Sequence, residues 1–566
     1  MLAVLLAAAL LPSSSRAQPP DPVLDALSAE LRRSVKGLRM AEPGTPLYYL
    51  SYQAVETRAR SLSAILGSLH EESEGVSRTL DVDARVGSRA LDNTHQIKGA
   101  ESAGHEDASA AGELPVDDEP RALRQAAWEL TDRAFKEAQS RYTKAAADKA
   151  VTADEADDSA DFSAEAPQRW SEPALPAPPD PGPWRDRLRR LSSGAARYPF
   201  LVGSNAALSL ETRRRWFADS DGAALADGDA VVRLDVALTA RTTGGMELDR
   251  SASWSEPSLD RLPPEEELAA VLTRLAEELG ELVRAPDAVP YQGPAVFGST
   301  AAAVLFHEIL GHRLEGHRQK LESEGQTFAK KLGQPVTAEF LSVYDDPSLR
   351  ALGGRALSGA YRFDDEGQPG RRAQLVKDGR LTGFLMSRAP IAAAPRSNGH
   401  GRRSSGRRAV ARMANLVVEA SRTVPAKDLR ALLRAELKRQ DKPWGLWFED
   451  IEGGYTTTTR DANQAFEVQP KLVYRVWADG RPDEPVHGVD IVGTPLASFM
   501  KIVAAGDDLG VFNGVCGAES GWVPVSASAP SLLFSEIEVE KGRKDAERPP
   551  LLPAPHHDPR VKGLRP

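Results

Sequence analysis

The first half of the chain alternates between two patterns of apolar and polar residues. Apolar residues that recur every three or four positions predict amphipathic helices, and apolar residues at every second position predict half-buried strands. The predicted helices are residues 23–38, 120–151 and 264–284. The predicted strands are residues 46–54, 62–69, 80–91, 207–219 and 230–240. Together they predict a mixed α/β domain over residues 18–288.

An insertion is expected within this N-terminal domain, at about residues 100–184. It begins with the small and acidic residues 99–119, for which we expect a loop, and continues with the Ala-rich helix 120–151. It ends with residues 152–184, which are rich in Asp, Ala and Pro. Because that composition offers little apolar surface to bury, the last stretch is typical of a linker.

The second half of the chain, after an expected domain boundary at 286–293, is rich in hairpin signals. Lys377-Asp378-Gly379 and Asp479-Gly480 each follow a strand-like run and predict tight turns. We therefore predict an α+β fold of two domains, in which residues 289–541 form a β-rich C-terminal domain that carries a histidine-bearing helix. The Pro-rich and charged residues 542–566 predict a disordered tail.

The extreme N-terminus has the pattern of an export signal. Residues 2–11 form an apolar run that is too short to span a bilayer, and Ser15-Arg16-Ala17 places small residues around a cleavage site. We expect a signal peptide over 1–17 and an exported protein, periplasmic or extracellular. The alternative is a cytoplasmic protein, because no Lys or Arg precedes the apolar run. Since no later segment is long and apolar enough, we expect no membrane span in the mature chain.

The composition limits which partners and which kinds of metal site the chain can have. The chain has 566 residues, with 71 Lys and Arg against 81 Asp and Glu, so its net charge of −10 argues against nucleic acid as a partner. A single cysteine excludes an internal disulfide framework and any zinc site built of Cys pairs. A transition metal would therefore need histidine for most of its ligands, with at most one thiolate.

Three of the ten histidines lie in the sequence LFHEILGHRLEGHRQ, as His307, His312 and His317. His307-Glu308 resembles the start of the zinc-peptidase motif, but the second histidine follows at i+5 and not at i+4. On an ideal helix this spacing separates the two rings by roughly 140°. A π-type turn would bring them together, and Gly311 would make that local distortion less costly.

A third ligand is not fixed by spacing alone. Catalytic zinc usually takes three protein ligands and leaves a position for water, and the candidates here are Glu315, His317 and Cys516. Cys516 lies far downstream in a Gly-rich stretch. The alternative interpretations are that Cys516 is a small buried apolar residue and that His307 and His312 line an ordinary polar helix face.

Several ordered motifs resemble the TldD/PmbA metallopeptidase family, once described as modulators of DNA gyrase. They are FHEILGHRLEGH, YDDPSLRALGGRALSGAYRFDDEGQPG, VKDGRLTGFL, SNGHGRR and DLGVFNGVCGAESGWVPVSASAPSLL. The resemblance covers about residues 293–539, with a weaker architectural match over 20–284. It implies zinc bound by His307, His312 and Cys516, with Glu308 as the catalytic carboxylate. Because all four residues are present, the chain resembles the catalytic TldD-like type and not the inactive partner proteins of the family.

The motif and this resemblance together predict zinc-dependent hydrolysis of peptide bonds, with Glu308 as the base that activates water, and the resemblance implies short or unfolded peptides as substrates. Glu315 is expected to orient a liganding histidine, with a surface salt bridge as the alternative, and His317 is expected to be exposed to solvent. The competing functional hypothesis is a non-catalytic, zinc-braced interaction protein. A serine hydrolase is disfavoured because the chain lacks a G-x-S-x-G motif.

The expected partners and substrate contacts rest on the resemblance and on one basic stretch of the chain. The resemblance implies a homodimer or a heterodimer with a paralogue, and an extended peptide could add to a sheet edge. Residues 371–412 contain eleven basic residues against Asp378. This stretch could attract acidic peptides, but a solvated loop is the favoured interpretation. The apparent export signal and the insertion at 100–184 distinguish the chain from typical family members.

Overall fold

A computed structural model of the protein describes residues 21–41, 45–97, 109–151, 157–320, 324, 328–456, 466–492, 495–542, 552–555 and 557–561. The predicted signal peptide over 1–17 lies outside the described residues, as does most of the predicted tail over 542–566. Among the described helices, none combines the length and the apolar character needed to cross a bilayer.

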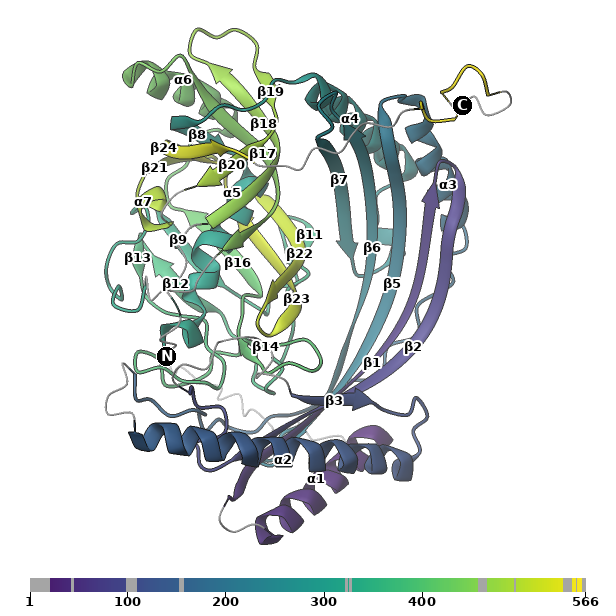
Figure 1. The fold of residues 1–566 in the computed structure, drawn as a ribbon, viewed down its shortest axis with the longest axis vertical. Coiled ribbons are helices and arrows are strands. Elements are labelled where there is room, and N and C mark those ends of the chain that lie inside the picture. The colour runs from purple at the N-terminus through teal and green to yellow at the C-terminus, as the bar shows by residue number, and fades with distance from the viewer. Residues whose placement is uncertain are drawn as a thin grey trace, which may run out of the picture.

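A long and strongly curved sheet, antiparallel except for the pairing of β4 with β6, dominates the N-terminal half (Figure 1). Its strands follow the order β3-β2-β1-β5-β6-β4 in the described chain, and β7 also pairs with β6. At about 3.3 Å per residue, the 19-residue strands β1, β2 and β5 each extend about 60 Å. The strand bounds are β1 Leu47–Ile65, β2 Ser68–Val86, β3 Ala110–Glu113, β4 Arg169–Ser171, β5 Leu201–Asp219, β6 Ala224–Arg241 and β7 Glu247–Glu256.

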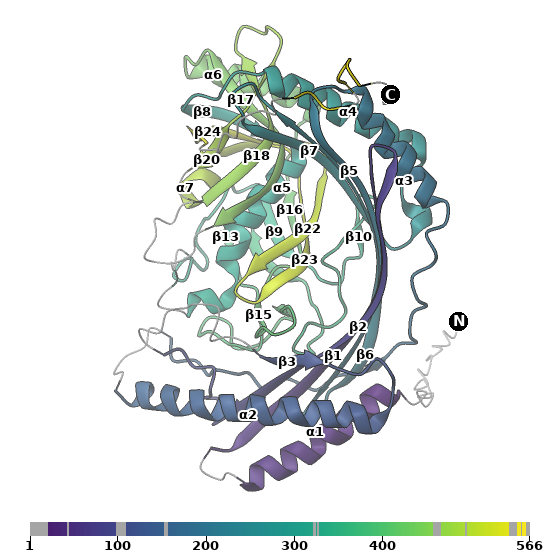
Figure 2. The ribbon, with the colours of Figure 1, turned by 45° about the vertical axis from the view of Figure 1, so that its right-hand side comes forward.

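Four helices cover this sheet in two separate pairs. Helices α1 and α2 lie side by side across one end of the sheet, while α3 and α4 pack on the outer face toward its other end (Figure 1 and Figure 2). Each pair closes its own apolar core against alternate strand residues. The helix bounds are α1 Pro22–Ala41, α2 Pro120–Val151, α3 Trp184–Ser193 and α4 Glu265–Arg284. All three predicted N-terminal helices are present, and α3 was not predicted.

Most strand expectations are correct in type but too short, whereas the expected strand over 80–91 runs past Val86, where β2 ends. Residues 207–219 and 230–240 lie inside the longer strands β5 and β6. The prediction of one strand over 62–69 is wrong, because Leu66 and Gly67 have positive φ values of 48° and 86° and form the turn between β1 and β2. Two successive residues with positive φ suit a tight hairpin, whose twist matches that of the flanking strands.

The expected loop and linker of the insertion are partly wrong. Within residues 99–119, β3 pairs with β2, and the long helix α2 contributes to the core beneath the sheet. In the expected linker, Phe162 is almost fully buried against Tyr49, and β4 pairs with β6. Composition understated the packing of this stretch because a few well-placed side chains are enough to anchor it.

The C-terminal half contains two sheets that enclose a shared core. The first has the order β13-β12-β9-β16-β23-β22. The second has the order β17-β8-β24-β20-β18-β19, with β21 paired to β24 and with an added β17–β18 pairing that closes a ring of strands. The bounds are β8 Tyr291–Phe297, β9 Leu341–Asp345, β10 Ala351–Leu352, β11 Arg355–Ala356, β12 Ala373–Lys377, β13 Arg380–Leu381, β14 Gly401–Arg402, β15 Val410–Ala411, β16 Asn415–Ala420, β17 Trp444–Thr456, β18 Phe466–Trp477, β19 Glu484–Val486, β20 Val489–Val492, β21 Ile502–Ala505, β22 Gly510–Ala518, β23 Gly521–Ala529 and β24 Leu532–Lys541.

The helices of this half are α5 Ser299–Phe306, α6 Leu429–Arg439 and α7 Pro495–Phe499. Both predicted hairpins are confirmed: Asp378 and Gly379 have φ values of 48° and 74° between β12 and β13, and Gly480 has a φ of 86° between β18 and β19. The hairpin of β22 and β23 lies on the side of this half that faces the curved sheet (Figure 1 and Figure 2). Its position matters because Cys516 belongs to β22.

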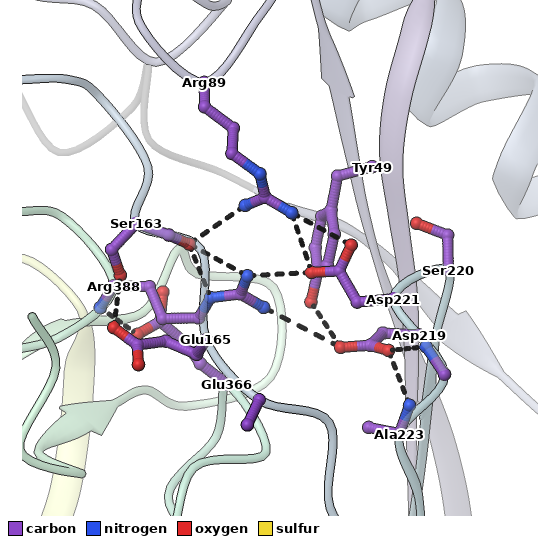
Figure 3. Close-up of polar contacts among 12 residues, drawn as sticks. Tyr49, Arg89, Ser163, Glu165, Asp219, Ser220, Asp221, Ala223, Glu366 and Arg388 are labelled. Carbon is purple, nitrogen blue, oxygen red and sulfur yellow. Dashed lines mark hydrogen bonds and ion pairs between the residues drawn. The ribbon is translucent and has the colours of Figure 1, made fainter.

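The expectation of a solvated loop over 371–412 is partly wrong, because some of its basic residues are exposed and others are buried. Of the eleven basic residues, Arg388, Arg402 and Arg412 are buried, and Arg388 and Arg412 have no exposed surface at all. Figure 3 shows Arg388 at the junction of the two halves, where its Nη2 donates to Ser163 O at 3.0 Å and to Asp221 Oδ2 at 2.9 Å. The charge is neutralised by carboxylates from distant segments, which local composition cannot reveal.

Candidate metal centre

The histidine-bearing segment begins as a buried helix and then widens. In α5, residues 301–306 are all buried apolar residues, which fix the helix within the C-terminal core. Residues His307–Gly311 then form a π turn, in which the backbone N–H of His312 donates to the carbonyl of His307. The predicted π-type turn is therefore confirmed. The extra residue in the turn places His312 on the same side of the segment as His307.

Gly311 serves this turn for a different reason than expected. Its φ of −56° and ψ of −54° are ordinary helical values, so the backbone needs no glycine flexibility there. A Cβ at this position would instead lie 2.0 Å from the Sδ of Met413. The glycine is needed for space, because the thioether of Met413 packs directly against the backbone beside His312.

Cys516 reaches the two histidines from β22, 209 residues after His307. Its Sγ lies 3.2 Å from Nε2 of His307 and 3.2 Å from Nε2 of His312. The two imidazole rings are 5.2 Å apart between centroids and nearly perpendicular, at 82°. All three side chains are buried. The structure thus brings the three expected ligands to one point, with their donor atoms within 4.8 Å of one another.

The electrostatics of the trio favour a thiolate. Burial opposes ionisation, but the charges of His312 and His307 hold the pKa of the Cys516 thiol well below its usual range. Burial likewise opposes a charge on His312, while Cys516 and Glu315 raise its pKa well above the usual value. The sulfur of Cys516 and the ring of His312 therefore stabilise each other's charged forms, and a cation can take the place of the proton between them.

Glu308 lies beside the trio without joining it. Its Oε2 is 4.0 Å from Nε2 of His312, and the side chain is buried. Burial raises the pKa of this carboxyl, while the positive charges of His307 and His312 oppose the rise. The carboxylate is thus close enough to act on a water molecule at the site, yet it is not needed as one of the three ligands.

Glu315 contacts the other face of His312. Its Oε1 lies 3.2 Å from Nδ1 of His312, and its Oε2 accepts a hydrogen bond of 2.8 Å from Nε of Arg318. Glu315 has no exposed surface. Burial alone would raise the pKa of this carboxyl, but His312, Arg318 and Arg412 together lower it to about 2. The residue is an ionised acceptor that fixes which nitrogen of His312 faces Cys516.

The expected exposure of His317 is wrong. His317 is buried, and its Nε2 contacts Oε1 of Glu519, which lies in the turn between β22 and β23. Arg318 donates to the other oxygen of Glu519 at 2.8 Å. These contacts fasten the segment after His312 to the hairpin that carries Cys516. Since the guanidinium of Arg318 already neutralises both Glu315 and Glu519, this second cluster of possible ligands is satisfied without a metal.

The donor set of His307, His312 and Cys516 fits zinc. Two imidazole nitrogens and one sulfur converge, and such N and S donors suit the borderline-soft Zn²⁺ ion. Three protein ligands leave a tetrahedral ion one further position, as catalytic zinc sites do. The buried Nδ1 of His307 has no hydrogen-bond partner among the described residues, so no carboxylate orients this ring as Glu315 orients that of His312.

Sequence reasoning missed two residues that contact the site, Arg412 and Glu519. Arg412 belongs to the basic stretch that was expected to be solvated, although the apolar run after it (MANLVV) indicates a buried strand. Glu519 follows Cys516 by three residues in the Gly-rich stretch. The basic pair His317-Arg318 was the signal for such a residue, because these side chains need an acidic partner if they are buried.

Comparisons with known proteins agree with these features. Residues 290–541 match the family model of the PmbA/TldA metallopeptidase C-terminal domain. A metalloprotease TldD homologue of Haemophilus influenzae is 28% identical over 330 residues, which are 56% of this chain and 64% of that protein. A zinc metalloprotease TldD homologue of Saccharolobus solfataricus is 24% identical over 255 residues, which are 44% of this chain and 51% of that protein.

The solved structures extend the likeness to the whole fold. The crystal structure of TldE from Thermococcus kodakarensis superposes with a TM-score of 0.58 at 16% sequence identity. The superposition covers 91% of this chain and 100% of that chain. The predicted α+β fold class is confirmed by this likeness and by the sheets and helices described above.

Proposed function

From the membership of this chain in the TldD/PmbA metallopeptidase family, to which its C-terminal domain belongs, we propose that the protein is a zinc-dependent peptidase. One observation carries the proposal: His307 and His312 each place Nε2 at 3.2 Å from Sγ of Cys516, with Glu308 beside them. A polar helix face or a lone apolar cysteine would not require three donors to meet at a single point.

The metal supplies the electrophile of the reaction: bound zinc polarises a peptide carbonyl and lowers the pKa of water. The residues of the chain supply the rest. His307, His312 and Cys516 hold the ion, and Glu315 keeps His312 in the tautomer whose Nε2 is free to bind. Because Glu315 is ionised and wholly buried, its hold on Nδ1 of His312 does not depend on solvent.

Glu308 acts as the general base and then as the general acid. Its carboxylate takes a proton from the attacking water and later delivers it to the amine of the leaving peptide. The residue suits both steps because it is buried next to the ligands without being one of them. A carboxylate committed to the metal would have no free oxygen for this proton.

The position of β22 supports the proposed substrate class. This strand ends its sheet in the described chain, so a further strand can pair with its outer edge wherever its backbone groups are not already bonded, as the carbonyl of Cys516 is to Arg412. An extended peptide that pairs with this edge would pass the sulfur of Cys516 and be held mainly by main-chain hydrogen bonds. Such binding favours short or unfolded peptides with little preference for sequence. Replacing single peptide amides by N-methyl amides should weaken binding at alternate positions, and uniform tolerance would contradict edge pairing.

The catalytic role of Glu308 is tested with Glu308→Gln. This variant should bind zinc as the wild type does but lose hydrolysis of an unstructured peptide by at least about 100-fold, the lower bound for a general base. Glu366→Gln is a matched control, because Glu366 is also a buried glutamate but contacts Arg388 and not the trio. Undiminished hydrolysis by zinc-loaded Glu308→Gln would contradict the assignment and favour the zinc-braced interaction protein.

The expected assembly and location are part of the proposal. We expect a homodimer or a heterodimer with a paralogue, which mass measurement in solution, alone and with the paralogue added, would test. We expect cleavage after residue 17 and export, which N-terminal sequencing of protein from separate cell fractions would test. An intact N-terminus in the cytoplasmic fraction would contradict export.

A further inference from the structure

Arg412 is the one arginine of the basic stretch that reaches a proposed metal ligand among the described contacts. Its Nη2 donates to Sγ of Cys516 at 3.1 Å and to the carbonyl of the same residue at 2.9 Å. Its Nη1 donates to Oγ of Ser520 at 2.9 Å and to the carbonyl of Gly521 at 3.1 Å. The guanidinium therefore forms hydrogen bonds to the hairpin of β22 and β23 on both sides of its turn.

The same guanidinium also faces the histidine segment. Its Nε lies 3.3 Å from Oε1 of Glu315, the oxygen that is 3.2 Å from Nδ1 of His312. Arg412 thus contacts Cys516 directly and His312 through Glu315. Both Arg412 and Glu315 have no exposed surface, so this link is not weakened by solvent.

We propose that Arg412 is a positioning residue of the metal centre. It fixes the positions of Cys516 and His312 relative to each other, and it limits how much electron density the sulfur gives to the ion. The inference rests on the proposed function, because it takes His307, His312 and Cys516 as the ligands. Hydrogen bonds to a ligating sulfur are known to tune metal centres, and a charged donor forms stronger bonds than a neutral one.

The geometry requires an arginine in particular. A planar guanidinium presents five N–H donors in a fixed fork, whereas the ammonium of lysine is a single point charge. Here the fork bonds a sulfur, carbonyls and a hydroxyl while its Nε faces a carboxylate. A lysine at this position could neutralise one anion but could not span Cys516 and Glu315 together.

Cobalt substitution tests the inference without relying on activity. Thiolate bound to Co²⁺ gives a sulfur-to-metal charge-transfer absorption, whose energy falls when the sulfur becomes richer in electrons. Removing the N–H···S bond in Arg412→Lys should therefore move the band to longer wavelength, and zinc affinity in a chelator competition should fall about 10–100-fold. Arg388→Lys is the matched control, because Arg388 is equally buried but contacts Ser163 and Asp221. This control should leave band and affinity unchanged.

The outcomes separate this inference from the proposed function. If the wild type shows the charge-transfer band and Arg412→Lys shows it at the same wavelength, the inference is overturned and the proposed ligand set is unaffected. A wild-type spectrum without such a band, or a band that persists in Cys516→Ser, overturns the proposed ligand set.

If Arg412→Lys does not fold, the wild-type cobalt protein decides the question. Once the Nε2 atoms of His307 and His312 face the ion, Arg412 is the donor left to Sγ among the described contacts of Cys516. The Co–S stretching frequency, measured by resonance Raman spectroscopy, should then differ between protein exchanged into D₂O and protein in H₂O. An identical frequency after full exchange would overturn the inference.

Discussion

Replacing Gly311 by alanine should destabilise the C-terminal half, although alanine is the better helix former. Gly311 has helical dihedral angles, so alanine alone would gain about 0.5–1 kcal/mol. Its Cβ, however, would lie 2.0 Å from Sδ and 3.0 Å from Cε of Met413, which is itself buried. Overpacking of this kind costs about 1–3 kcal/mol. The net loss is therefore about 1 kcal/mol, or a fall of about 2–4 °C in the unfolding temperature of a domain of this size.

Calorimetry of matched variants tests whether Gly311→Ala lowers the stability. Gly37→Ala is the control, because Gly37 lies in α1 and a Cβ there meets nothing within 4 Å. This variant should stabilise the N-terminal half by about 0.5–1 kcal/mol. In a Met413→Ala background, the cost of Gly311→Ala should disappear, which a double-mutant cycle would show as a coupling of about 1–2 kcal/mol. Stabilisation by Gly311→Ala, or an unchanged cost in that background, would refute the packing argument.

Three further predictions follow from buried charges. Glu315→Gln should lower zinc affinity about 10–100-fold in a chelator competition, because the partner of His312 Nδ1 loses its charge, and an unchanged affinity would contradict that role. Arg388→Met should cost about 3 kcal/mol in denaturant unfolding, since it leaves Asp219 and Asp221 without this partner, and a cost below about 1 kcal/mol would contradict the junction described here. Burial raises the pKa of Glu366 to about 7. The folded state therefore binds more protons than the unfolded state between about pH 4.5 and 7, and stability should fall as pH rises through this window. Glu366→Gln should flatten that fall, and an equally steep fall in the variant would assign it to another group.

The regular parts of the fold were predictable where one face of an element is buried. Alternation is clear in β5 and β6, because every second residue packs under α3 and α4. It fails in the middle of β1, where residues 56–61 are mostly polar on both faces, and at the turn of Leu66 and Gly67. A strand that is held mainly by its neighbours carries little hydrophobic signal of its own.

The π turn was predictable because two histidines at i and i+5 require it if they are to bind one ion. Spacing alone could not select Cys516 among the candidate third ligands, since it comes 204 residues after His312, and the resemblance to a known motif singled it out. Chain folding, and not local pattern, brings such distant donors together.

The buried charges were the main failure of sequence reasoning. His317 and Arg412 were expected at the surface because charged residues are rarely buried without a partner. Their partners come from distant parts of the chain, Glu519 from the turn between β22 and β23 and Glu315 from the segment after His312, so neither burial nor pairing is visible in the local sequence. These residues surround the proposed ligands, where chemistry and not packing dictates the choice of residue.

X-ray absorption at the zinc edge of the purified protein tests the central claim most directly. The claim predicts about one zinc per chain, with nitrogen ligands at about 2.0–2.1 Å and one sulfur at about 2.3 Å. The sulfur signal should vanish in Cys516→Ser, while the nitrogen signal of any zinc that remains should persist. Protein that binds no zinc, or zinc whose shell contains no sulfur in the wild type, would contradict the convergence of His307, His312 and Cys516 on one ion.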